Sequence, residues 1–501
     1  MPERAYFPES SLFANLLKQH ELVPVCCEVM ADLDTPLTLF AKISDTSGHQ
    51  FLFESMEGGE KWGRYSFIGF DPLLTFQASG DQITITETVQ AKPHNRTFTA
   101  NPLEAMRALI SDMNAADIPE LPRFCGGAVG FLGYDIVRFL EDLPDTRPAL
   151  GLPDASFMVP RIVLVHDSFK QKVTVVCWVR RADGEVADAA YAKAKQRISQ
   201  IVHTLRGGVP PRFLAESTRK EGEPHVFSSN MEPSQFESMV ERAKEYILAG
   251  DIFQVVLSQR FHTKSSISPT LLYRALRHIN PSPYLFFLQQ GDLIQIGSSP
   301  EILVRKTGDD IELRPIAGTR KRGATEEEDK ALAEELLADP KECAEHLMLV
   351  DLGRNDVGRV SLGGSVEVRD LLVIERYSHV MHIVSGVHGR IAPDKDQFDV
   401  IAACFPAGTV SGAPKIRAME IIDELEPDKR GAYAGSVGYF GFSGNMDFCI
   451  TIRTFILHGD DLWIQAGAGI VADSDPRKEY EETINKSLGL RRAVELAEKG
   501  F

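Results

Sequence analysis

The spacing of apolar and polar positions predicts a chain that mixes amphipathic helices with short strands. One stripe has apolar residues at intervals of three and four, the period of a helical face: Phe236, Val240, Ala243 and Ile247. Ser234 and Glu237 have the spacing of a capping box, so we expect this helix to begin at Ser234. Gly250 ends the stripe, and the apolar run at 251–259 predicts a strand.

The first two hundred residues carry mostly strand patterns. Residues 51–55 form a short apolar run, and residues 161–166 and 172–178 predict the two strands of a hairpin. An alanine-rich helix is expected over residues 184–205. Short strands continue to alternate with helices and glycine turns downstream. This order predicts an α+β fold, with antiparallel β-sheets in a sandwich-like core and helices on the outside.

A change in composition near residue 210 predicts the domain organisation. Glycines and prolines at 206–211 precede a polar, charged stretch that ends at Asn230. We therefore expect an N-terminal α/β domain over residues 1–210, a linker over 211–230 and a second domain over 231–501.

Net charge and composition exclude several classes of function. The chain has 501 residues and a formal net charge of −17, which argues against nucleic acid or an anionic membrane as partner. No apolar run approaches the roughly 20 residues of a membrane span, and the first residues lack a signal-peptide core. We expect a cytoplasmic protein. Its seven cysteines include no C-x-x-C pair, which predicts reduced thiols and no zinc site.

Two segments repeat one pattern, in which Asp-Pro is followed by two glutamates three residues apart. The pairs are Glu342 with Glu345, after Asp339, and Glu479 with Glu482, after Asp475. Asp-Pro is typical of a helix N-cap, and glutamates at this spacing share one helical face. Four such carboxylates suit Mg²⁺. Taken alone, however, each pair is better explained by capping, by the helix dipole or by a solvated acidic face.

Motifs from about residue 230 onward resemble those of chorismate-utilising enzymes, and among them the large component of anthranilate synthase. They occur in the family's order at 252–260, 280–284, 297–301, 314–320, 345–356, 405–415 and 467–475. The resemblance is weaker over the N-terminal half. It implies the anthranilate-synthase type of fold and a Mg²⁺-dependent reaction of chorismate.

The resemblance implies a metal site and a substrate site. Glu345 and Glu482 would bind Mg²⁺ directly, and Glu342 and Glu479 would bind it through water. Arg453 would bind the enolpyruvyl carboxylate, because a planar guanidinium matches that group. Further substrate contacts are implied for Gly318, Thr319, Tyr433, Gly467, Gly469 and Lys486. For Lys486, an ion pair with Glu482 is the alternative.

Four catalytic positions are also implied: Gln254, Glu301, His382 and Thr409. Glu301 would protonate the departing ring hydroxyl, and His382 would serve the elimination of pyruvate. Without the resemblance, Glu301 would be an ordinary glutamate at the start of a strand and His382 a packed histidine.

Three positions favour anthranilate over the products of sibling enzymes. Enzymes that add water generally have lysine where Gln254 stands, and aminodeoxychorismate synthases typically have lysine in place of Ala317. His382 indicates that the aminated intermediate loses pyruvate. The alternatives are an aminodeoxychorismate or aminodeoxyisochorismate synthase, or a non-catalytic regulator that binds chorismate or tryptophan. Intact Glu301, His382 and glutamate pairs oppose the last of these.

The resemblance also implies a partner and a regulator. Ammonia would come from a separate glutamine amidotransferase subunit, in a heterotetramer of two large and two small subunits. Tryptophan would inhibit this first committed step of its own biosynthesis. The implied inhibitor site comprises Glu54, Ser55, Arg64, Pro281, Ser282, Pro283 and Tyr284.

Overall fold

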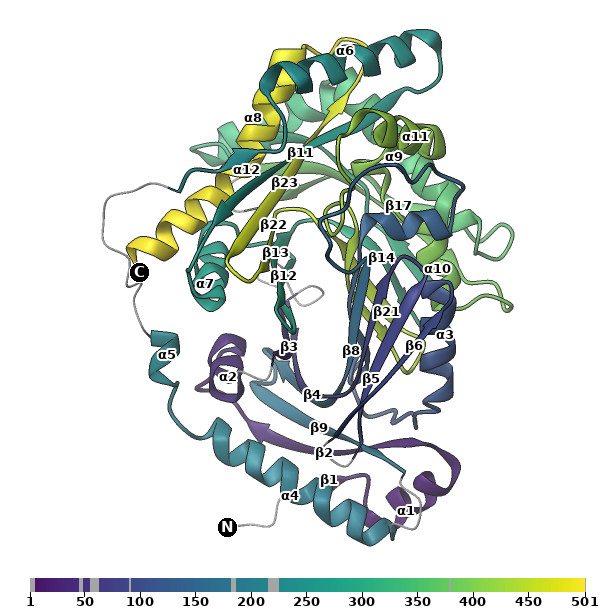
Figure 1. Cartoon of the computed structure of the whole chain (residues 1–501), viewed down its shortest axis with the longest axis vertical. Coiled ribbons are helices and arrows are strands. Elements are labelled where there is room, and N and C mark those ends of the chain that lie inside the picture. The colour runs from purple at the N-terminus through teal and green to yellow at the C-terminus, as the bar shows by residue number, and fades with distance from the viewer. Residues whose placement is uncertain are drawn as a thin grey trace.

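A computed structural model describes residues 5–44, 48–54, 63–89, 92–181, 186–214, 225–377 and 380–500. Its strands pair with one another in antiparallel register, and helices cover their outer sides (Figure 1). The α+β prediction is therefore confirmed. Among the described residues, no helix is both long enough and apolar enough to cross a membrane.

The elements of the first half are β1 (Tyr6–Phe7), α1 (Ser10–Gln19), β2 (Leu22–Met30), α2 (Pro36–Ile43), β3 (His49–Glu54), β4 (Tyr65–Ser79), β5 (Gln82–Val89), β6 (Lys92–Thr99), α3 (Pro102–Asp112), β7 (Gly127–Leu132), η1 (Tyr134–Phe139), β8 (Ala155–Asp167), β9 (Lys172–Arg180), α4 (Ala187–Leu205) and α5 (Pro211–Leu214). The predicted hairpin is confirmed as β8 and β9, which pair from Ile162↔Cys177 to Asp167↔Lys172.

The elements of the second half are β10 (Ser228–Ser229), α6 (Pro233–Ala249), β11 (Gln254–Lys264), α7 (Pro269–Ile279), β12 (Tyr284–Gln290), β13 (Leu293–Ser299), β14 (Ile302–Thr307), β15 (Asp310–Leu313), β16 (Ile316–Lys321), α8 (Glu326–Ala338), α9 (Pro340–Gly358), β17 (Glu367–Arg376), β18 (Val380–Arg390), α10 (Gln397–Cys404), η2 (Gly408–Val410), β19 (Gly412–Ala413), α11 (Lys415–Leu425), β20 (Ser436–Gly441), β21 (Met446–Ile450), β22 (Thr454–His458), β23 (Asp461–Ile470) and α12 (Pro476–Lys499).

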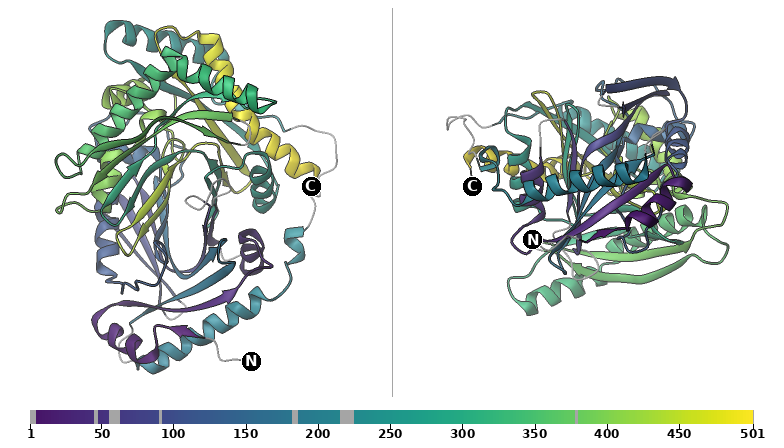
Figure 2. Two further views of the ribbon diagram at one scale, coloured as in Figure 1. Left: turned by 180° about the vertical axis from the view of Figure 1, so that it is seen from behind. Right: turned by 90° about the horizontal axis from the view of Figure 1, so that it is seen from below.

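Helices cover the two ends of the molecule, and α3 and α10 pack together along its flank (Figure 1). At one end α1 and α4 lie outside β2 and β9, and at the other end α6, α11 and α12 lie outside β11 and β23 (Figures 1 and 2). Helix α4 packs onto β2 and β9 with an apolar face that includes its residues Tyr191, Ile198 and Val202. This packing buries the stripe that the alanine-rich helix presents at a period of 3.6 residues.

Strand pairing joins the two halves of the chain. β3 pairs with β12 from His49↔Gln290 to Glu54↔Leu285, and β7 pairs with β20 from Gly127↔Gly441 to Leu132↔Ser436. Each half therefore completes a sheet of the other. The division into residues 1–210, 211–230 and 231–501 stays a prediction, and part of the expected linker lies outside the described residues.

Local capping chemistry sets the ends of three helices that the sequence predicts. Helix α6 begins at Pro233 rather than Ser234, because the Glu232 backbone N–H donates to the Gln235 side chain at 2.7 Å and completes a capping box there. The two Asp-Pro helices are confirmed. Asp339 caps α9 by accepting from the backbone of Lys341, and Asp475 caps α12 in the same way.

Gly130 provides a test of this architecture, because β7 runs between β8 and β20. A Cβ at Gly130 would lie 2.0 Å from the Ser156 carbonyl oxygen and 2.7 Å from the Phe157 Cα, both backbone atoms. We expect Gly130→Ala to lower the free energy of unfolding by about 2–4 kcal/mol in urea titrations. Gly208→Ala, where no atom lies within 4 Å, is the control and should change it by less than about 0.5 kcal/mol. Equal stability of the two variants would contradict the close packing of β7.

Candidate functional site

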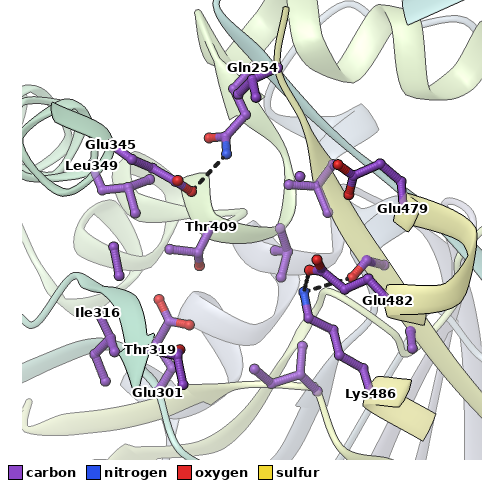
Figure 3. Close-up of a pocket in the computed structure, with 18 of the residues that line it drawn as sticks. Gln254, Glu301, Ile316, Thr319, Glu345, Leu349, Thr409, Glu479, Glu482 and Lys486 are labelled. Atoms are coloured by element: carbon purple, nitrogen blue, oxygen red, sulfur yellow. Dashed lines mark hydrogen bonds and ion pairs between the residues drawn. The ribbon is translucent and has the colours of Figure 1, made fainter. Parts of the chain in front are cut away.

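A cavity of about 620 Å³ opens between β11 and β23 on one side and β16 and β18 on another, with the N-terminal parts of α9 and α12 at its rim (Figure 3). It brings together most of the site residues predicted from the sequence. Those that line it are Gln254, Glu301, Thr319, Glu345, His382, Thr409, Tyr433, Arg453, Gly467, Gly469, Glu479, Glu482 and Lys486. Gly318 and Glu342 do not line it.

Strand alternation explains how β11 and β23 build the cavity wall. Gln254 and Val256 face it from β11, and Gln465, Gly467 and Gly469 face it from β23, each two residues from the next. A Cβ at Gly467 would lie 2.7 Å from the Tyr433 hydroxyl oxygen. Only glycine at this position therefore lets β23 approach Tyr433 so closely. The sequence prediction missed Gln465, although its two-residue spacing from Gly467 was a usable signal.

His382 lies opposite Thr319 in the β16–β18 pairing. Its Nδ1 is 3.0 Å from the Gly318 carbonyl oxygen and 3.1 Å from Thr319 Oγ1. A carbonyl oxygen only accepts, so Nδ1 carries the proton and Nε2 keeps its lone pair. Burial lowers the pKa of His382, which keeps the ring neutral. This histidine is therefore prepared to accept a proton at Nε2.

Gly318 contributes through its backbone. Its φ is +65°, a left-handed conformation that glycine adopts without strain, and the register of β16 shifts between Ala317 and Thr319. This bulge directs the Gly318 carbonyl toward His382.

Glu301 is a buried carboxyl group between β13 and β14. Burial raises its pKa to about 7, while the positive charges of Arg453 and Lys486 act in the opposite direction. Figure 3 shows Glu301 with Thr319 and Thr409 on one side of the cavity and Glu479, Glu482 and Lys486 on the other. A carboxyl group with this pKa can hold a proton near neutral pH and release it to a leaving group.

Arg453 places a positive charge in the cavity wall. Its backbone has φ +50°, a left-handed conformation that is uncommon outside glycine and is typical of functional sites. Burial lowers the pKa of its guanidinium, and the nearby Glu301 acts in the opposite direction. Within the described part of the chain, no hydrogen bond or ion pair reaches this guanidinium. A cation without a partner that faces a cavity is suited to bind an anion.

The carboxylates of α9 and α12 line the cavity from facing sides (Figure 3). Glu345 accepts from the Gln254 side-chain amide at 3.0 Å, and Glu482 pairs with Lys486 at 2.7 Å. Lys486 also donates to the Gly467 carbonyl at 3.0 Å. The structure therefore contains the Glu482–Lys486 ion pair that the sequence offered as an alternative to a substrate contact.

These carboxylates fit Mg²⁺ by their chemistry. Burial raises the pKa of Glu479, and the negative charge of the neighbouring Glu482 raises it further. A divalent cation bound here would offset the repulsion between these two carboxylates. Glu342 points elsewhere and accepts from Arg320 at 3.0 Å. Across the described residues, no three His, Cys, Asp or Glu side chains lie close enough to hold a metal ion in this conformation. Binding would require Glu345 and Glu482 to leave their present partners.

A second, smaller cavity of about 60 Å³ contains part of the predicted inhibitor site. Glu54, Pro283 and Tyr284 line it, together with Arg123 and Arg305, which the sequence prediction did not include. Glu54 is buried there and accepts from Tyr273 and Arg277.

Three of the other predicted inhibitor residues do not line this cavity. Pro281 and Ser282 do not line this cavity, and Ser55 lies outside the described residues. Arg64 donates to Asp167 Oδ2 at 2.8 Å and does not line it either.

Comparison with known proteins gives consistent matches over nearly the whole chain. The chorismate binding enzyme family matches residues 48–491. Anthranilate synthase component 1 of Acetivibrio thermocellus is 48% identical over 98% of this chain and 99% of its own length. The protein of the same name from Cereibacter sphaeroides is 49% identical over 94% of each chain.

Two solved structures share the fold. The crystal structure of anthranilate synthase component I from Streptococcus pneumoniae has a TM-score of 0.75 and 37% identity, and it covers 92% of this chain and 99% of its own. The menaquinone-specific isochorismate synthase MenF from Escherichia coli has a TM-score of 0.70 at 20% identity, covers 97% of this chain and 100% of its own, and supports the fold alone.

The raised pKa of Glu301 predicts a pH-dependent cost to stability. As pH rises above the ordinary value of 4.5, the unfolded carboxyl ionises while the folded one stays protonated to about 7, so stability is lost across this window. We expect Glu301→Gln to exceed the parent protein in free energy of unfolding by about 1–3 kcal/mol at pH 8, and by much less near pH 4.5. Urea titrations across this pH range measure the difference. The exposed Glu481→Gln should show no such gain, and a parallel profile for both variants would contradict the assignment.

Proposed function

Because this chain belongs to the chorismate-binding enzyme family, in the group of anthranilate synthase component 1, we propose that its large cavity converts chorismate and ammonia to anthranilate, pyruvate and water. The observation that supports this most directly is the distribution of charge in the cavity. Arg453 offers a cation without a partner, while Glu345, Glu479 and Glu482 offer oxygen ligands at the rim. Chorismate carries two carboxylates, so a guanidinium and a metal could each bind one.

Mg²⁺ would be held directly by Glu345 and Glu482 and through water by Glu479, with Glu342 also contributing through water if it leaves Arg320. When bound, the cation would neutralise the ring carboxylate and draw electron density from the ring. Arg453 would hold the enolpyruvyl carboxylate with two parallel hydrogen bonds. The backbone N–H groups near Gly467 and Gly469 and the Tyr433 hydroxyl supply further polar contacts.

The chemical roles of the chain's own residues follow from their protonation states. Glu301 donates its proton to the departing ring hydroxyl, which leaves as water while ammonia forms the new carbon–nitrogen bond. His382 Nε2 then removes the proton from the ring as the bond to the enolpyruvyl oxygen breaks and pyruvate departs. Burial supports both roles, because it favours the neutral forms of the acid and of the base at the same pH.

Two wall residues favour ammonia over water or an enzyme amine as nucleophile. Gln254 donates to Glu345, and an amide cannot take a proton from water as a desolvated lysine can. Ala317 also lines the cavity and offers no amine. The aminodeoxychorismate, aminodeoxyisochorismate and non-catalytic alternatives therefore rank below anthranilate formation.

A partner and a regulator complete the proposal. We propose that a glutamine amidotransferase subunit supplies ammonia, in an assembly of two large and two small subunits. We further propose that tryptophan, the end product of the pathway that this reaction begins, binds beside Glu54, Pro283 and Tyr284. The carboxylate of Glu54 suits the ligand's ammonium group, and the ring of Tyr284 suits its indole.

The decisive assay mixes the purified chain with chorismate, Mg²⁺ and ammonium and follows fluorescent anthranilate and pyruvate. Removal of Mg²⁺ with a chelator should stop turnover, and added Mg²⁺ should restore it. Glu345→Gln and Glu482→Gln should each lower kcat by about 100-fold or more, because each removes a charged metal ligand. Glu481→Gln is the matched control. Its carboxylate pairs with Arg477 away from the cavity, so kcat should stay within about two-fold.

Isochorismate, aminodeoxychorismate or no product in this assay would each reject the proposed reaction. Equal loss of activity in Glu345→Gln, Glu482→Gln and the control Glu481→Gln would reject the metal assignment but not the proposed reaction.

The inhibitor site predicts a separation of inhibition from catalysis. Glu54→Gln should raise the inhibition constant for tryptophan by about ten-fold or more, because it removes the charge that faces the ligand ammonium. Uninhibited kcat should stay within about two-fold, since Glu54 does not line the large cavity. Glu87→Gln, on the surface of the same half, is the control. Unchanged tryptophan sensitivity in Glu54→Gln would place the inhibitor elsewhere.

A further inference from the structure

A buried ion pair lies directly behind the wall of the large cavity. Arg430 is 2% exposed and Glu426 is 3% exposed, and neither lines the cavity. Arg430 Nε donates to Glu426 Oε2 at 2.9 Å and Nη2 donates to Glu426 Oε1 at 2.6 Å, so the pair is bidentate. Helix α11 ends just before Glu426, and the pair lies on the chain that leads from this helix to Tyr433.

The guanidinium binds two segments of the cavity wall that are far apart in sequence. Arg430 Nη1 donates to the Val410 carbonyl oxygen at 2.6 Å, and Nη2 donates to the Val256 carbonyl oxygen at 2.6 Å. Val410 ends the η2 turn that carries Thr409, and Val256 lies on β11. The guanidinium carbon also lies 5.7 Å from the centre of the Tyr433 ring. One side chain therefore ties together three parts of the wall.

The carboxylate of the pair reaches a fourth part of the wall through Ser258. Glu426 Oε1 accepts from the Ser258 backbone N–H at 2.8 Å and from its hydroxyl at 2.9 Å. The Ser258 hydroxyl thereby donates its only proton, so Ser258 Oγ can only accept from Gln465. Gln465 Nε2 lies 2.8 Å from it. The Glu426 carboxylate thus fixes which end of the Gln465 amide is bound behind the cavity wall.

We infer that Arg430 and Glu426 form a positioning pair for the reaction in the large cavity, an inference that rests on the proposed function. A buried ion pair is expensive to desolvate and contributes little to stability by itself. Here its hydrogen bonds reach Val410, which follows Thr409, and Val256 of β11. They also reach Ser258, which binds Gln465, and the guanidinium lies near the Tyr433 ring. The pair sets the distances of these groups from Glu301, while Arg453 and the rim carboxylates hold the substrate without its help.

The test compares Arg430→Lys with Arg138→Lys. Lysine keeps the charge but cannot form the fork that binds Glu426, Val256 and Val410 together. Arg138 is a matched control, because it pairs with Asp423 of α11 at 2.6 Å, is nearly buried and contacts no residue of the large cavity. We expect Arg430→Lys to lower kcat by about 20-fold or more with KM for chorismate within about three-fold, and Arg138→Lys to change kcat by less than about two-fold.

A second variant covers the case in which Arg430→Lys fails to fold. Ser258→Ala removes the connection from Glu426 to Gln465 and leaves the ion pair intact. It should lower kcat by about five-fold with an unchanged melting temperature to within about 3 °C.

The outcomes separate this inference from the proposed function. If the parent protein forms no anthranilate, the proposed function fails. If the parent is active but folded Arg430→Lys and Ser258→Ala both keep kcat within about two-fold, the pair has no positioning role. Equal losses in Arg430→Lys and Arg138→Lys would also reject that role, because they would reflect a general loss of stability.

Discussion

A positive charge held in a desolvated wall is the constraint on which the large cavity depends. The chain has a formal net charge of −17, so a dianionic substrate can bind only where the protein concentrates positive charge locally. Arg453 does this from a left-handed backbone position, with no hydrogen bond or ion pair to a described side chain. The carboxylates of Glu345, Glu479 and Glu482 line the same cavity. Under the proposed function they would hold a second positive charge, that of Mg²⁺.

Burial has opposite effects on the acid and the base that face this cavity. It raises the pKa of Glu301 and lowers that of His382, so one environment yields a protonated acid and a neutral base together. The hydrogen bond from His382 Nδ1 to the Gly318 carbonyl also orients the ring, because it leaves Nε2 as the nitrogen that can accept a proton. Protonation and orientation therefore have separate structural causes.

Features of this site that depend on neighbouring residues could be predicted from the sequence, whereas features that depend on long-range packing could not. The Asp-Pro caps of α9 and α12 depend on neighbours within one turn, so the pattern alone predicts them. The start of α6 was wrong by one residue, because the helix uses a capping box of Glu232 and Gln235 instead of one of Ser234 and Glu237. The predicted residues that line the large cavity followed mainly from the family resemblance.

Features that depend on tertiary structure were not predictable in this way. The left-handed bulge at Gly318 and the burial of the Arg430–Glu426 pair are set by segments distant in sequence. Likewise, the α+β class followed from the alternation of elements, but the pairing of β3 with β12 did not, because register across more than two hundred residues has no local signal.

That pairing has a consequence for how the chain can be divided. Cutting near the expected linker would leave β12 and β20 of the second half without β3 and β7, and each would become an exposed sheet edge. Such edges present unpaired backbone groups that recruit strands from other molecules. A recombinant fragment made at that sequence boundary would therefore tend to aggregate or to exchange strands with its neighbours, and a soluble fragment would need a cut that follows the sheet instead.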